Sequence, residues 1–548
     1  MKTLYYRDFA LTEYPAYNLH LALAAAREQK AARLVLDGGV FDIDPVWCDE
    51  RYLAYSNHGF NGPKRIAALI EDMHDFELDC GGATFLCHGI VTPVAILRSE
   101  NITVKNLVLD NDRNGFLELR AEAYGPDYTD FEILRGFAGA YRIIHSQLYT
   151  AYEAYESAIF PAQWNVEYNG ETGEIQPGTG DHTFGVQPGE LTFEQIDDRH
   201  LRCRGYKRQI PLGNVCVFHG AHRFGAGIFC LDSRRVTVEN VTIHGCYGMG
   251  FVGQVSEDIT LRGFATRRAP GRYHTANADA THFLNCSGTV LVEDSYFEGQ
   301  YDDALNIQGI YVRVVGRDRG GLLVREMHVE AKDIRMFRPG DRVRAMRPDP
   351  LIPYAEKTVE TVEYISGDIC RLTFAEGAED IAVGDDLDNI TRNPALIFRN
   401  NVVKDNRARG MLIATAGRTV IENCYFHSSG TAVKFESDGA YWFESGGTQD
   451  VTIEGNRFDG CRYANWGYGV IECQARKEVL PDQYFHGTIR VLNNDFRMVT
   501  EDVARMNNVE NFLFSGNRIT PVAGGDAVVS VAHVGHYDVQ SDVTLKNL

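Results

Sequence analysis

Three features are missing from this sequence of 548 residues, and each absence excludes a class of function. No stretch reaches the roughly 18 apolar residues that a membrane span requires, so we expect no membrane partner. No run of five or more Lys and Arg residues occurs and the formal net charge is −21, so we expect no nucleic-acid partner. The twelve cysteines show no CxxC or Cys/His metal spacing, which indicates buried free thiols, with disulfides between repeats as the alternative. No metal-ligand spacing of a known kind occurs elsewhere in the sequence either, so we predict no metal and no cofactor; Ca²⁺ bound by Asp-rich loops is the alternative.

The N-terminus also lacks the pattern of a secretion signal. Its first apolar residues are interrupted by Arg7, Asp8 and Glu13, and the apolar run at 21–26 is followed at once by charged residues. This pattern indicates an amphipathic helix at about 18–30, which would cap one end of the fold. We predict a cytoplasmic protein, or a secreted or periplasmic one if a signal was removed. The sequence sets no oligomeric state.

A short pattern recurs along the chain: an alternating strand, then Asn, then an aromatic or aliphatic residue. Examples are NITVKNLVL, RVTVENVTI, DVTIEGNRF and NFLFSGNRI. β-Branched residues alternate with period two and Asn tolerates the left-handed turn conformation, so these are short strands rather than helices. Repeats of this kind predict an all-β fold, a right-handed parallel β-helix in which each coil stacks on the next.

The length of one coil follows from equivalent apolar positions. These recur after 23 residues three times and after 20 residues once: Val236 to Ile259, Ile228 to Phe251, His282 to Leu305, and Leu412 to Ala432. One coil of a parallel β-helix has about this length. The inward residues of successive coils should therefore stack into a core of Val, Ile, Leu and Phe.

Two stretches interrupt the repeat with short strands and turns, and each is predicted to be a small inserted β-barrel-like domain. The chain then divides into an N-terminal cap with the first coils (1–112), a first insertion (113–213), coils with the candidate catalytic residues (214–311), a second insertion (312–392) and the C-terminal coils (393–548).

Three aspartates are the candidate catalytic residues. Asp279 lies in NADATHF, and Asp302 and Asp303 lie in YDDALNI. Asp279 and Asp302 are 302 − 279 = 23 residues apart, which should place them on neighbouring coils about 4.8 Å apart. Glycoside hydrolysis needs one carboxylic acid and a second carboxylate, and crowded carboxylates raise the pKa of one member. The alternative is that Asp302 and Asp303 are ordinary turn residues before a strand. Adjacent residues of a regular strand point to opposite faces, so both side chains reach solvent only if the chain bends at this pair.

Further polar residues are expected to surround these aspartates. Two arginines in NRARGMLIAT should lie at the same edge, unless they are merely ion-paired surface groups. An exposed Trp among carboxylates in FESDGAYWFES suits a sugar, whose C–H face stacks while its hydroxyls are hydrogen-bonded. The predicted substrate-binding residues are His282, Asn306, Arg407, Arg409, Glu436, Asp438, Trp442 and Glu444.

Five long motifs carry a family resemblance: FGAGIFCLDSRRVTVENVTIHGCYGMGFVGQVSEDITL, TANADATHFLNCSG, FEGQYDDALNIQG, NRARGMLIAT and GTAVKFESDGAYWFESG. Together they resemble glycoside hydrolase family 110, the exo-acting α-1,3-galactosidases, from about Leu34 to the C-terminus. The resemblance implies an inverting, metal-independent enzyme that removes terminal α-1,3-linked galactose from blood-group-B-type or linear α-galactosyl glycans. Asp279, Asp302 and Asp303 fall on the active-site aspartates of the family.

Two other functions share these features. The NADA…DD arrangement is also similar to that of polygalacturonases, but the Gly-His-Gly and Arg-Ile-Lys motifs of those enzymes are missing, which argues against a pectin hydrolase or lyase. A non-catalytic glycan-binding β-helix is the third reading, because a fold does not dictate function. The chain departs from family 110 at Gln308, where a His is expected.

Overall fold

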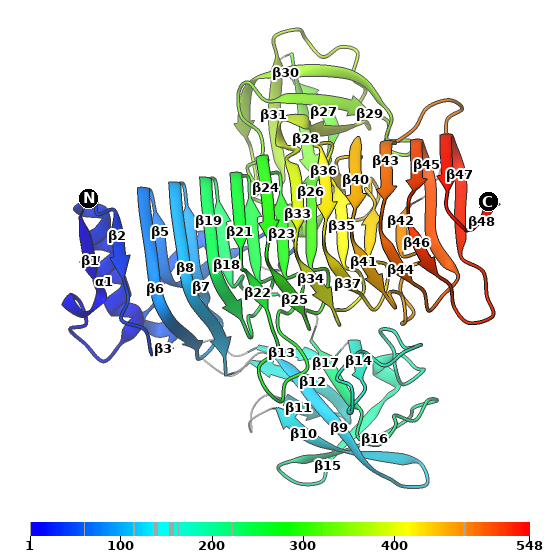
Figure 1. The fold of residues 1–548 in the computed structure, drawn as a ribbon. Coiled ribbons are helices and arrows are strands. Elements are labelled where there is room, and N and C mark those ends of the chain that lie inside the picture. The colour runs from blue at the N-terminus through cyan, green and yellow to red at the C-terminus, as the bar shows by residue number, and fades with distance from the viewer. Residues whose placement is uncertain are drawn as a thin grey trace.

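The computed structural model describes residues 2–59, 61–112, 115–135, 141–152, 158–162, 164–220, 223–318, 320–474 and 478–548. Three columns of stacked parallel strands form a long coil that runs from the N-terminus to the C-terminus (Figure 1). Within the predicted first insertion, residues 113–114, 136–140, 153–157 and 163 lie outside the described ranges. A parallel β-helix is the fold that the repeats predicted.

The first column carries the strands that matter most for function. It consists of β5 (Gly62–Glu71), β7 (Thr92–Leu97), β18 (Ile228–Leu231), β20 (Phe251–Gln254), β23 (Thr281–Leu284), β26 (Leu305–Ile310), β35 (Met411–Ala414), β38 (Val433–Phe435), β42 (Ile471–Cys473), β45 (Asp502–Ser515), β47 (Val528–Gln540) and β48 (Thr544–Asn547).

The second and third columns complete each coil. The second consists of β1 (Thr3–Tyr5), β2 (Arg33–Val35), the first halves of β6 (His74–Cys87), β8 (Glu100–Asn111) and β19 (Arg234–Ile243), then β21 (Glu257–Arg262), β24 (Ser287–Glu293), β33 (Ala395–Arg399), β36 (Thr419–Glu422), β40 (Asp450–Glu454) and β43 (His486–Leu492), which pairs with the second half of β45. The third consists of β3 (Val40–Ile43), the second halves of β6, β8 and β19, then β22 (Ala265–Thr266), β25 (Tyr296–Glu298), β34 (Val402–Lys404), β37 (Tyr425–His427), β41 (Arg457–Asp459), β44 (Asp495–Arg497) and β46 (Arg518–Thr520).

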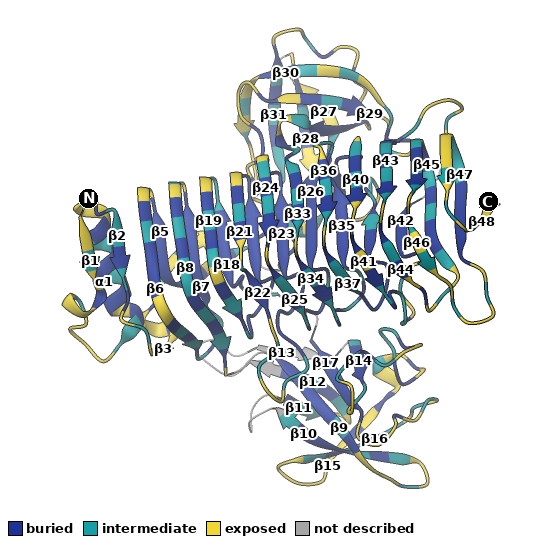
Figure 2. Ribbon diagram, in the orientation of Figure 1, coloured by how far each residue is buried: buried dark blue, intermediate teal, exposed yellow. Residues whose placement is uncertain are grey.

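Buried residues run along the strands of the coil (Figure 2). Their apolar side chains form the core that the repeats predicted. Ile102, Val236, Ile259, Val290 and Leu396 lie in register on five successive strands of the second column, and all are buried. Each inward residue therefore covers the apolar surface of the one on the previous coil, which is the main stabilising contribution of such a fold.

Two of the four spacings were predicted correctly and two were wrong. Ile228 pairs with Phe251 and Val236 with Ile259, as expected. His282 pairs with Asn306 rather than with Leu305, so the coil that carries the aspartates has 306 − 282 = 24 residues. Leu412 pairs with Lys434 rather than with Ala432. Coil length varies because the turns between strands can take extra residues without disturbing the core: Phe251 to Thr281 is 281 − 251 = 30 residues and Val433 to Ile471 is 471 − 433 = 38.

The N-terminal end is closed by a helix, as predicted. Helix α1 (Pro15–Glu28) buries Leu19, Ala22 and Leu23, and it lies beside β2 at the first coil in Figure 1. The short helices η1 (Tyr6–Asp8) and η2 (Pro45–Trp47) and the strand β4 (Asp49–Leu53), antiparallel to β5, complete this end. No helix of the described residues is long and apolar enough to span a membrane. All twelve cysteines are free and buried, which confirms the predicted thiols.

Two insertions project from the middle of the coil (Figure 1). The sheet domain (residues 116–219) is a six-stranded antiparallel sheet with a three-stranded sheet beside it: β9 (Phe116–Tyr124), β10 (Tyr128–Arg135), β14 (Trp164–Tyr168), β15 (Thr192–Gln195), β16 (His200–Arg204) and β17 (Val215–His219), then β11 (Tyr141–Ile144), β12 (Gln147–Tyr152) and β13 (Ala158–Pro161), with η3 (Pro188–Glu190). The barrel (residues 312–389) is closed: β27 (Val312–Asp318), β28 (Gly321–Glu326), β31 (Ile369–Phe374), β30 (Pro353–Tyr364), β29 (Arg342–Met346) and β32 (Asp386–Asn389), with η4 (Val329–Ala331) and, after it, η5 (Ile390–Arg392). The short strand β39 (Glu444–Ser445) pairs antiparallel with the end of β26.

Candidate active site

The candidate catalytic residues lie where the chain enters the strands of the first column. Asp279 precedes β23 by two residues, Asp303 precedes β26 by two, and Arg409 precedes β35 by two. Since Leu305 pairs with Met411, the residues two positions earlier, Asp303 and Arg409, also share a register position. The arginine pair therefore lies at the edge that the sequence indicated.

The three aspartates form one cluster. One carboxylate oxygen from each of Asp279, Asp302 and Asp303 lies within 4.8 Å of the others. The backbone N–H of Asp303 donates to Oδ1 of Asp279 at 3.2 Å. In the 24-residue coil, the register partner of Asp279 is thus Asp303 and not Asp302. The sequence placed the right three residues together, but it matched the wrong pair.

The chain bends at the aspartate pair, between Tyr301 and Ala304, before β26 begins. The alternation of a regular strand therefore does not govern the two side chains. The side chain of Asp302 is 16% exposed and faces the pocket described below, whereas that of Asp303 is fully buried. Only one member of the pair thus reaches the solvent side.

Three arginines contact the cluster. Arg409 donates to Asp303 at 2.8 Å, and its guanidinium also lies 3.5 Å from Asp302. Arg407 lies 3.5 Å from Asp302, and Arg223 donates to it at 3.4 Å. The positive charges of these three arginines offset the mutual repulsion of the carboxylates.

Asp303 has a perturbed pKa. Burial raises its pKa well above the usual value, the Arg409 charge opposes the shift, and the charges of Asp302 and Asp279 add to it. Among the described residues, Oδ2 of Asp303 has no hydrogen-bond partner. A buried carboxyl group with a raised pKa is a common feature of sites of acid catalysis, so the cluster favours retention of a proton next to the two aspartates that line the pocket.

A pocket of about 250 Å³ opens in front of the aspartates. Nine of its eleven lining residues are polar or charged, which suits a ligand covered with hydroxyl groups. The lining residues are Asn57, Arg223, Asp279, Asp302, Asn306, Arg409, Leu412, Glu436, Asp438, Trp442 and Glu444.

Two predicted substrate-binding residues lie behind the pocket wall. His282 is fully buried; its Nδ1 lies 2.9 Å from Asp279 and its Nε2 lies 3.1 Å from the Ser56 hydroxyl. Arg407 is held against Asp302 by a two-pronged ion pair with Asp181, at 2.6 and 2.9 Å. Both side chains position carboxylates and do not line the pocket.

The other predicted residues do line it. Asn306 faces outward from β26, and Glu436 is paired with Lys434 at 2.6 Å. The Asp438 carboxylate accepts backbone N–H groups of Ala440 and Tyr441 at 2.7 and 3.0 Å, so it also holds the loop that carries Trp442.

Glu444 is a second carboxyl group with a perturbed pKa. Burial raises its pKa to about 8, with Arg409 opposing and Glu436 adding to the shift. With its amide nitrogen facing Glu444, Gln308 donates to both carboxylate oxygens at 2.8 and 3.1 Å. Glu444 is therefore mainly uncharged at neutral pH and can donate a hydrogen bond into the pocket.

Several functional residues were missed from the sequence. Asn57 and Arg223 enter the site from the segments that precede β5 and β18, so a search of every segment before a first-column strand would have found them. Asp181 comes from the sheet domain, and no coil spacing relates it to Arg407.

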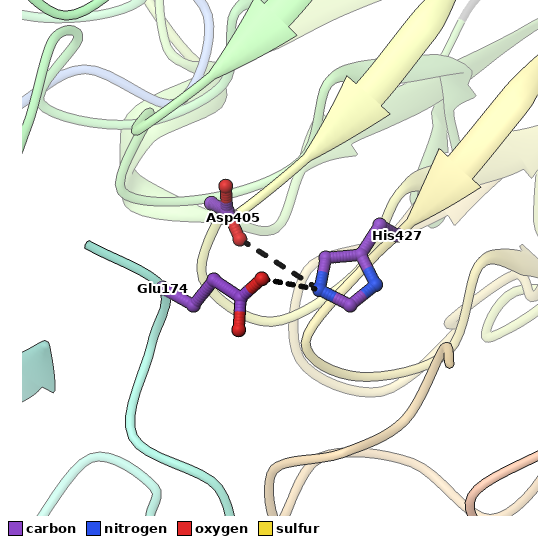
Figure 3. A group of neighbouring side chains, drawn as sticks. All are labelled: Glu174, Asp405 and His427. Atoms are coloured by element: carbon purple, nitrogen blue, oxygen red, sulfur yellow. Dashed lines mark ion pairs between the residues drawn. The ribbon is translucent and has the colours of Figure 1, made fainter. Parts of the chain in front are cut away.

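A second cluster lies where the sheet domain meets the coil. Figure 3 shows Glu174 and Asp405 facing the same nitrogen of His427, at 3.5 and 4.0 Å. This group and the aspartate cluster are the two sets in the described residues whose ligand atoms are close enough to hold a metal ion. However, Arg268 and Lys404 already contact Asp405, at 3.3 and 3.1 Å. Ion pairs within the coil, together with the contact of Glu174 with His427 between the two domains, account for this cluster.

Comparisons with known proteins give two matching family models and a solved structure of similar fold. Two family models match: "GLAA-B beta-barrel domain II" at residues 321–387, within the barrel, and "Right handed beta helix region" at 385–541, which gives the coil its hand. The solved structure of a family 28 exopolygalacturonase from Yersinia enterocolitica is similar with a TM-score of 0.41 and 11% identity, covering 99% of this chain and 79% of that one.

Curated relatives match nearly the whole chain. Alpha-1,3-galactosidase B of Phocaeicola vulgatus is 31% identical, over 92% of this chain and 88% of that protein. Alpha-1,3-galactosidase B of Bacteroides fragilis is 30% identical, over 90% and 86%. Alpha-1,3-galactosidase A of Shewanella woodyi is 27% identical, over 91% and 82%. With the fold, the carboxylate cluster and the polar pocket in agreement, this chain belongs to the α-1,3-galactosidase family and is a glycoside hydrolase.

Proposed function

We propose that this protein is an inverting exo-glycosidase of glycoside hydrolase family 110. It releases terminal α-1,3-linked galactose from oligosaccharides or glycoconjugates, of blood-group-B type or linear α-galactosyl type. The observation that carries the proposal is the pair of pocket-lining carboxylates, Asp279 and Asp302, backed by the buried carboxyl group of Asp303. The names of the relatives support galactose and the α-1,3 linkage.

The size of the pocket supports removal of a single sugar from the end of a chain. Its volume of about 250 Å³ lies below the roughly 300–1,000 Å³ of sites for drug-sized ligands. A pocket of this size fits one hexose ring better than a run of several sugars. The scissile bond then lies between the ring in the pocket and the sugar outside it.

The charge of the pocket supports a neutral sugar. Five acidic residues and two arginines line it. A galacturonate ring would bring its own carboxylate into this excess of negative charge, which costs free energy. This observation argues against the pectin-directed alternative.

Asp279 and Asp302 would act directly on the substrate, because they line the pocket and Asp303 does not. One of them protonates the departing oxygen while the other activates a water molecule. Asp303 acts through its neighbours, as a buried carboxyl group that shares a proton with them. Arg409 pairs with Asp303 at 2.8 Å, and its positive charge favours release of that proton to the neighbouring carboxylates.

The spacing of the carboxylates bears on stereochemistry. Inverting sites usually hold their carboxyl groups about 6.5–9.5 Å apart and retaining sites about 5–5.5 Å. Here the nearest oxygens are within 4.8 Å. A water molecule with hydrogen bonds of about 2.8 Å to each oxygen spans this gap, so the cluster can bind the attacking water directly. Because the same spacing is also close to that of retaining sites, a retaining mechanism is the second candidate.

Proton NMR during hydrolysis of Gal-α-1,3-Gal decides between these outcomes. We expect β-galactose as the first product. If α-galactose appears first, the mechanism is retaining and not inverting. If no α-galactoside is cleaved, the proposed function is wrong.

Asp302→Asn should lower kcat for Gal-α-1,3-Gal by about 10³-fold, because a positioned acid or base contributes roughly 10²–10⁴-fold. The change keeps the size of the side chain, so the melting temperature is expected to stay near that of the wild type. The exposed Asp526→Asn is the matched control. α-Galactosyl fluoride, whose leaving group needs no proton, separates the two roles. If Asp302 is the acid, the variant recovers activity on the fluoride; equal losses on both substrates make it the base.

A further inference from the structure

An aromatic surface adjoins the pocket. Tyr441 is 67% exposed and Trp442 is 38% exposed, and their rings meet edge to face at 5.2 Å. His328 of the barrel lies against both, with ring centroids 4.6 Å from Trp442 and 5.7 Å from Tyr441. We call these three side chains the aromatic platform. Trp442 also lines the pocket, so the platform begins where the pocket ends.

The loop that carries the platform is held rigidly. Asp438 accepts the backbone N–H groups of Ala440 and Tyr441, and the backbone N–H of Asp438 donates to the carbonyl of Glu444 at 3.0 Å. The Arg313 guanidinium of the barrel donates to the carbonyl of Gly439 at 3.1 Å. The aromatic rings are thus presented in a fixed position, which reduces the entropy lost when a ligand binds.

Phe443 shows why the neighbouring rings face outward. Its φ is 58°, in the left-handed region that bulky residues rarely adopt, and its ring is buried beside Tyr311 and Leu351. The N–H of Tyr311 donates to the Phe443 carbonyl at 2.8 Å, which fixes this conformation. Strained backbone of this kind persists where the surroundings impose it and is concentrated at ligand-binding sites. Burying Phe443 turns Tyr441 and Trp442 away from the interior.

His328 adds a polar group to the platform. Its Nδ1 accepts the backbone N–H of Glu330 at 3.2 Å, so the proton of the neutral ring lies on Nε2. Burial lowers the pKa of His328, which keeps the ring neutral. The platform therefore combines aromatic faces with an N–H donor, the combination that a pyranose ring needs for its C–H face and its hydroxyls.

From these contacts we infer that Tyr441, Trp442 and His328 bind the acceptor sugar, the hexopyranose that leaves when the terminal galactose is cut off. The inference rests on the proposed function, since the pocket must hold the galactose. It adds that the enzyme selects substrates with a pyranose ring next to the scissile bond. An aglycone that is too small to reach the platform gains nothing from it.

Two substrates test this inference. Gal-α-1,3-Gal reaches the platform, whereas α-galactosyl fluoride occupies only the galactose pocket. Tyr441→Ala should lower the ratio of kcat/KM for the disaccharide to kcat/KM for the fluoride by about 10- to 100-fold, the effect of losing an aromatic contact with the acceptor sugar. Trp442→Ala should lower the ratio as well, in addition to a loss shared by both substrates, because Trp442 also lines the galactose pocket. Tyr52→Ala removes a ring of equal exposure far along the chain, in β4, and should leave the ratio at the wild-type value.

A binding experiment gives an independent readout. In the Asp302→Asn background, titration calorimetry should show tighter binding of Gal-α-1,3-Gal than of galactose, and Trp442→Ala should abolish the difference. An unchanged substrate ratio and an unchanged affinity difference in both aromatic variants would overturn the platform. If the wild type cleaves the fluoride but no galactosyl disaccharide, the proposed function fails instead, so the two failures are distinguishable.

Discussion

The sheet domain and the barrel both reach the catalytic region, but through different kinds of side chain. From the sheet domain, Asp181 pairs with Arg407, which in turn lies 3.5 Å from Asp302. From the barrel, His328 packs against Trp442 at the rim of the pocket. One insertion thus acts on the charge of the cluster, and the other shapes the apolar surface beside it.

This difference teaches how a repeat fold acquires an active site. The coil supplies carboxylates and arginines at fixed register, because every strand of the first column begins at the same edge. Insertions then add what a coil cannot, namely side chains that approach from outside the stack. We therefore expect substitutions at the contacts made by the sheet domain to change kcat and the pH dependence of the rate. Substitutions at the contacts made by the barrel should change KM.

Among the variants that test this comparison, Asp181→Asn should have the largest effect. Arg407 would lose both hydrogen bonds to the carboxylate, and we expect kcat to fall by about 10- to 100-fold through misplacement of Asp302. Loss of a negative charge near the cluster also favours ionisation of the remaining carboxyl groups. The alkaline limb of the pH–rate profile should therefore move to lower pH.

Asp130→Asn is the matched control for this change. Asp130 makes the same two-pronged pair with Arg202, at 2.7 and 2.9 Å, but within the sheet domain and away from the pocket. Equal losses of activity in the two variants, with no movement of the pH profile, would mean that Asp181 only stabilises its domain.

Glu444 lies between Arg409 and the loop that carries Trp442, where the charged cluster meets the aromatic platform. A change at Glu444 should therefore affect activity less than Asp181→Asn and more than a change at His328. Its pKa of about 8 is above the unfolded value of 4.5, so the folded state holds the proton more tightly. The free energy of unfolding should therefore fall as pH rises from about 4.5 to about 8. Activity should also fall above pH 8, by up to about tenfold per unit, as the hydrogen-bond donor is lost.

Glu444→Gln keeps a donor and cannot ionise. We expect this variant to lose less activity than the wild type between pH 8 and 9, and to have the higher melting temperature at pH 9 but not at pH 5. The exposed Glu454→Gln should match the wild type at both values. If the decline above pH 8 is the same in the Glu444 variant, another group titrates there.

The sequence predicted the position of a residue wherever the register of the coils relates its spacing along the chain to its place in space. Asp279, Asp303 and Arg409 were predictable because each stands two residues before a strand of the first column. The pairing of Asp279 with Asp302 was wrong because the coil has 24 residues and not 23, and a single residue in a turn exchanges the two neighbours.

The contacts from the insertions were not predictable. Asp181 is 407 − 181 = 226 residues from its partner, and nothing in a coil repeat specifies how an inserted domain docks. Trp442 could be proposed from its acidic neighbours, but its contact with His328 depends on the position of the barrel. Tertiary packing decides such contacts, and short-range patterns carry no information about it.

The smallest effect should come from His328→Ala, which tests the barrel's share of the comparison. The ring packs on Trp442 with the ring centroids 4.6 Å apart, and we expect KM for Gal-α-1,3-Gal to rise about 2- to 5-fold, since one partly exposed aromatic contact is worth about 0.5–1.5 kcal/mol. His74→Ala removes an exposed imidazole at the start of β6 and serves as the control. A fall in kcat with KM unchanged would mean that the barrel, like the sheet domain, acts on the catalytic step, and the proposed difference between the two insertions would be wrong. A rise in KM confined to substrates with an acceptor sugar would instead show that each insertion controls a separate kinetic step.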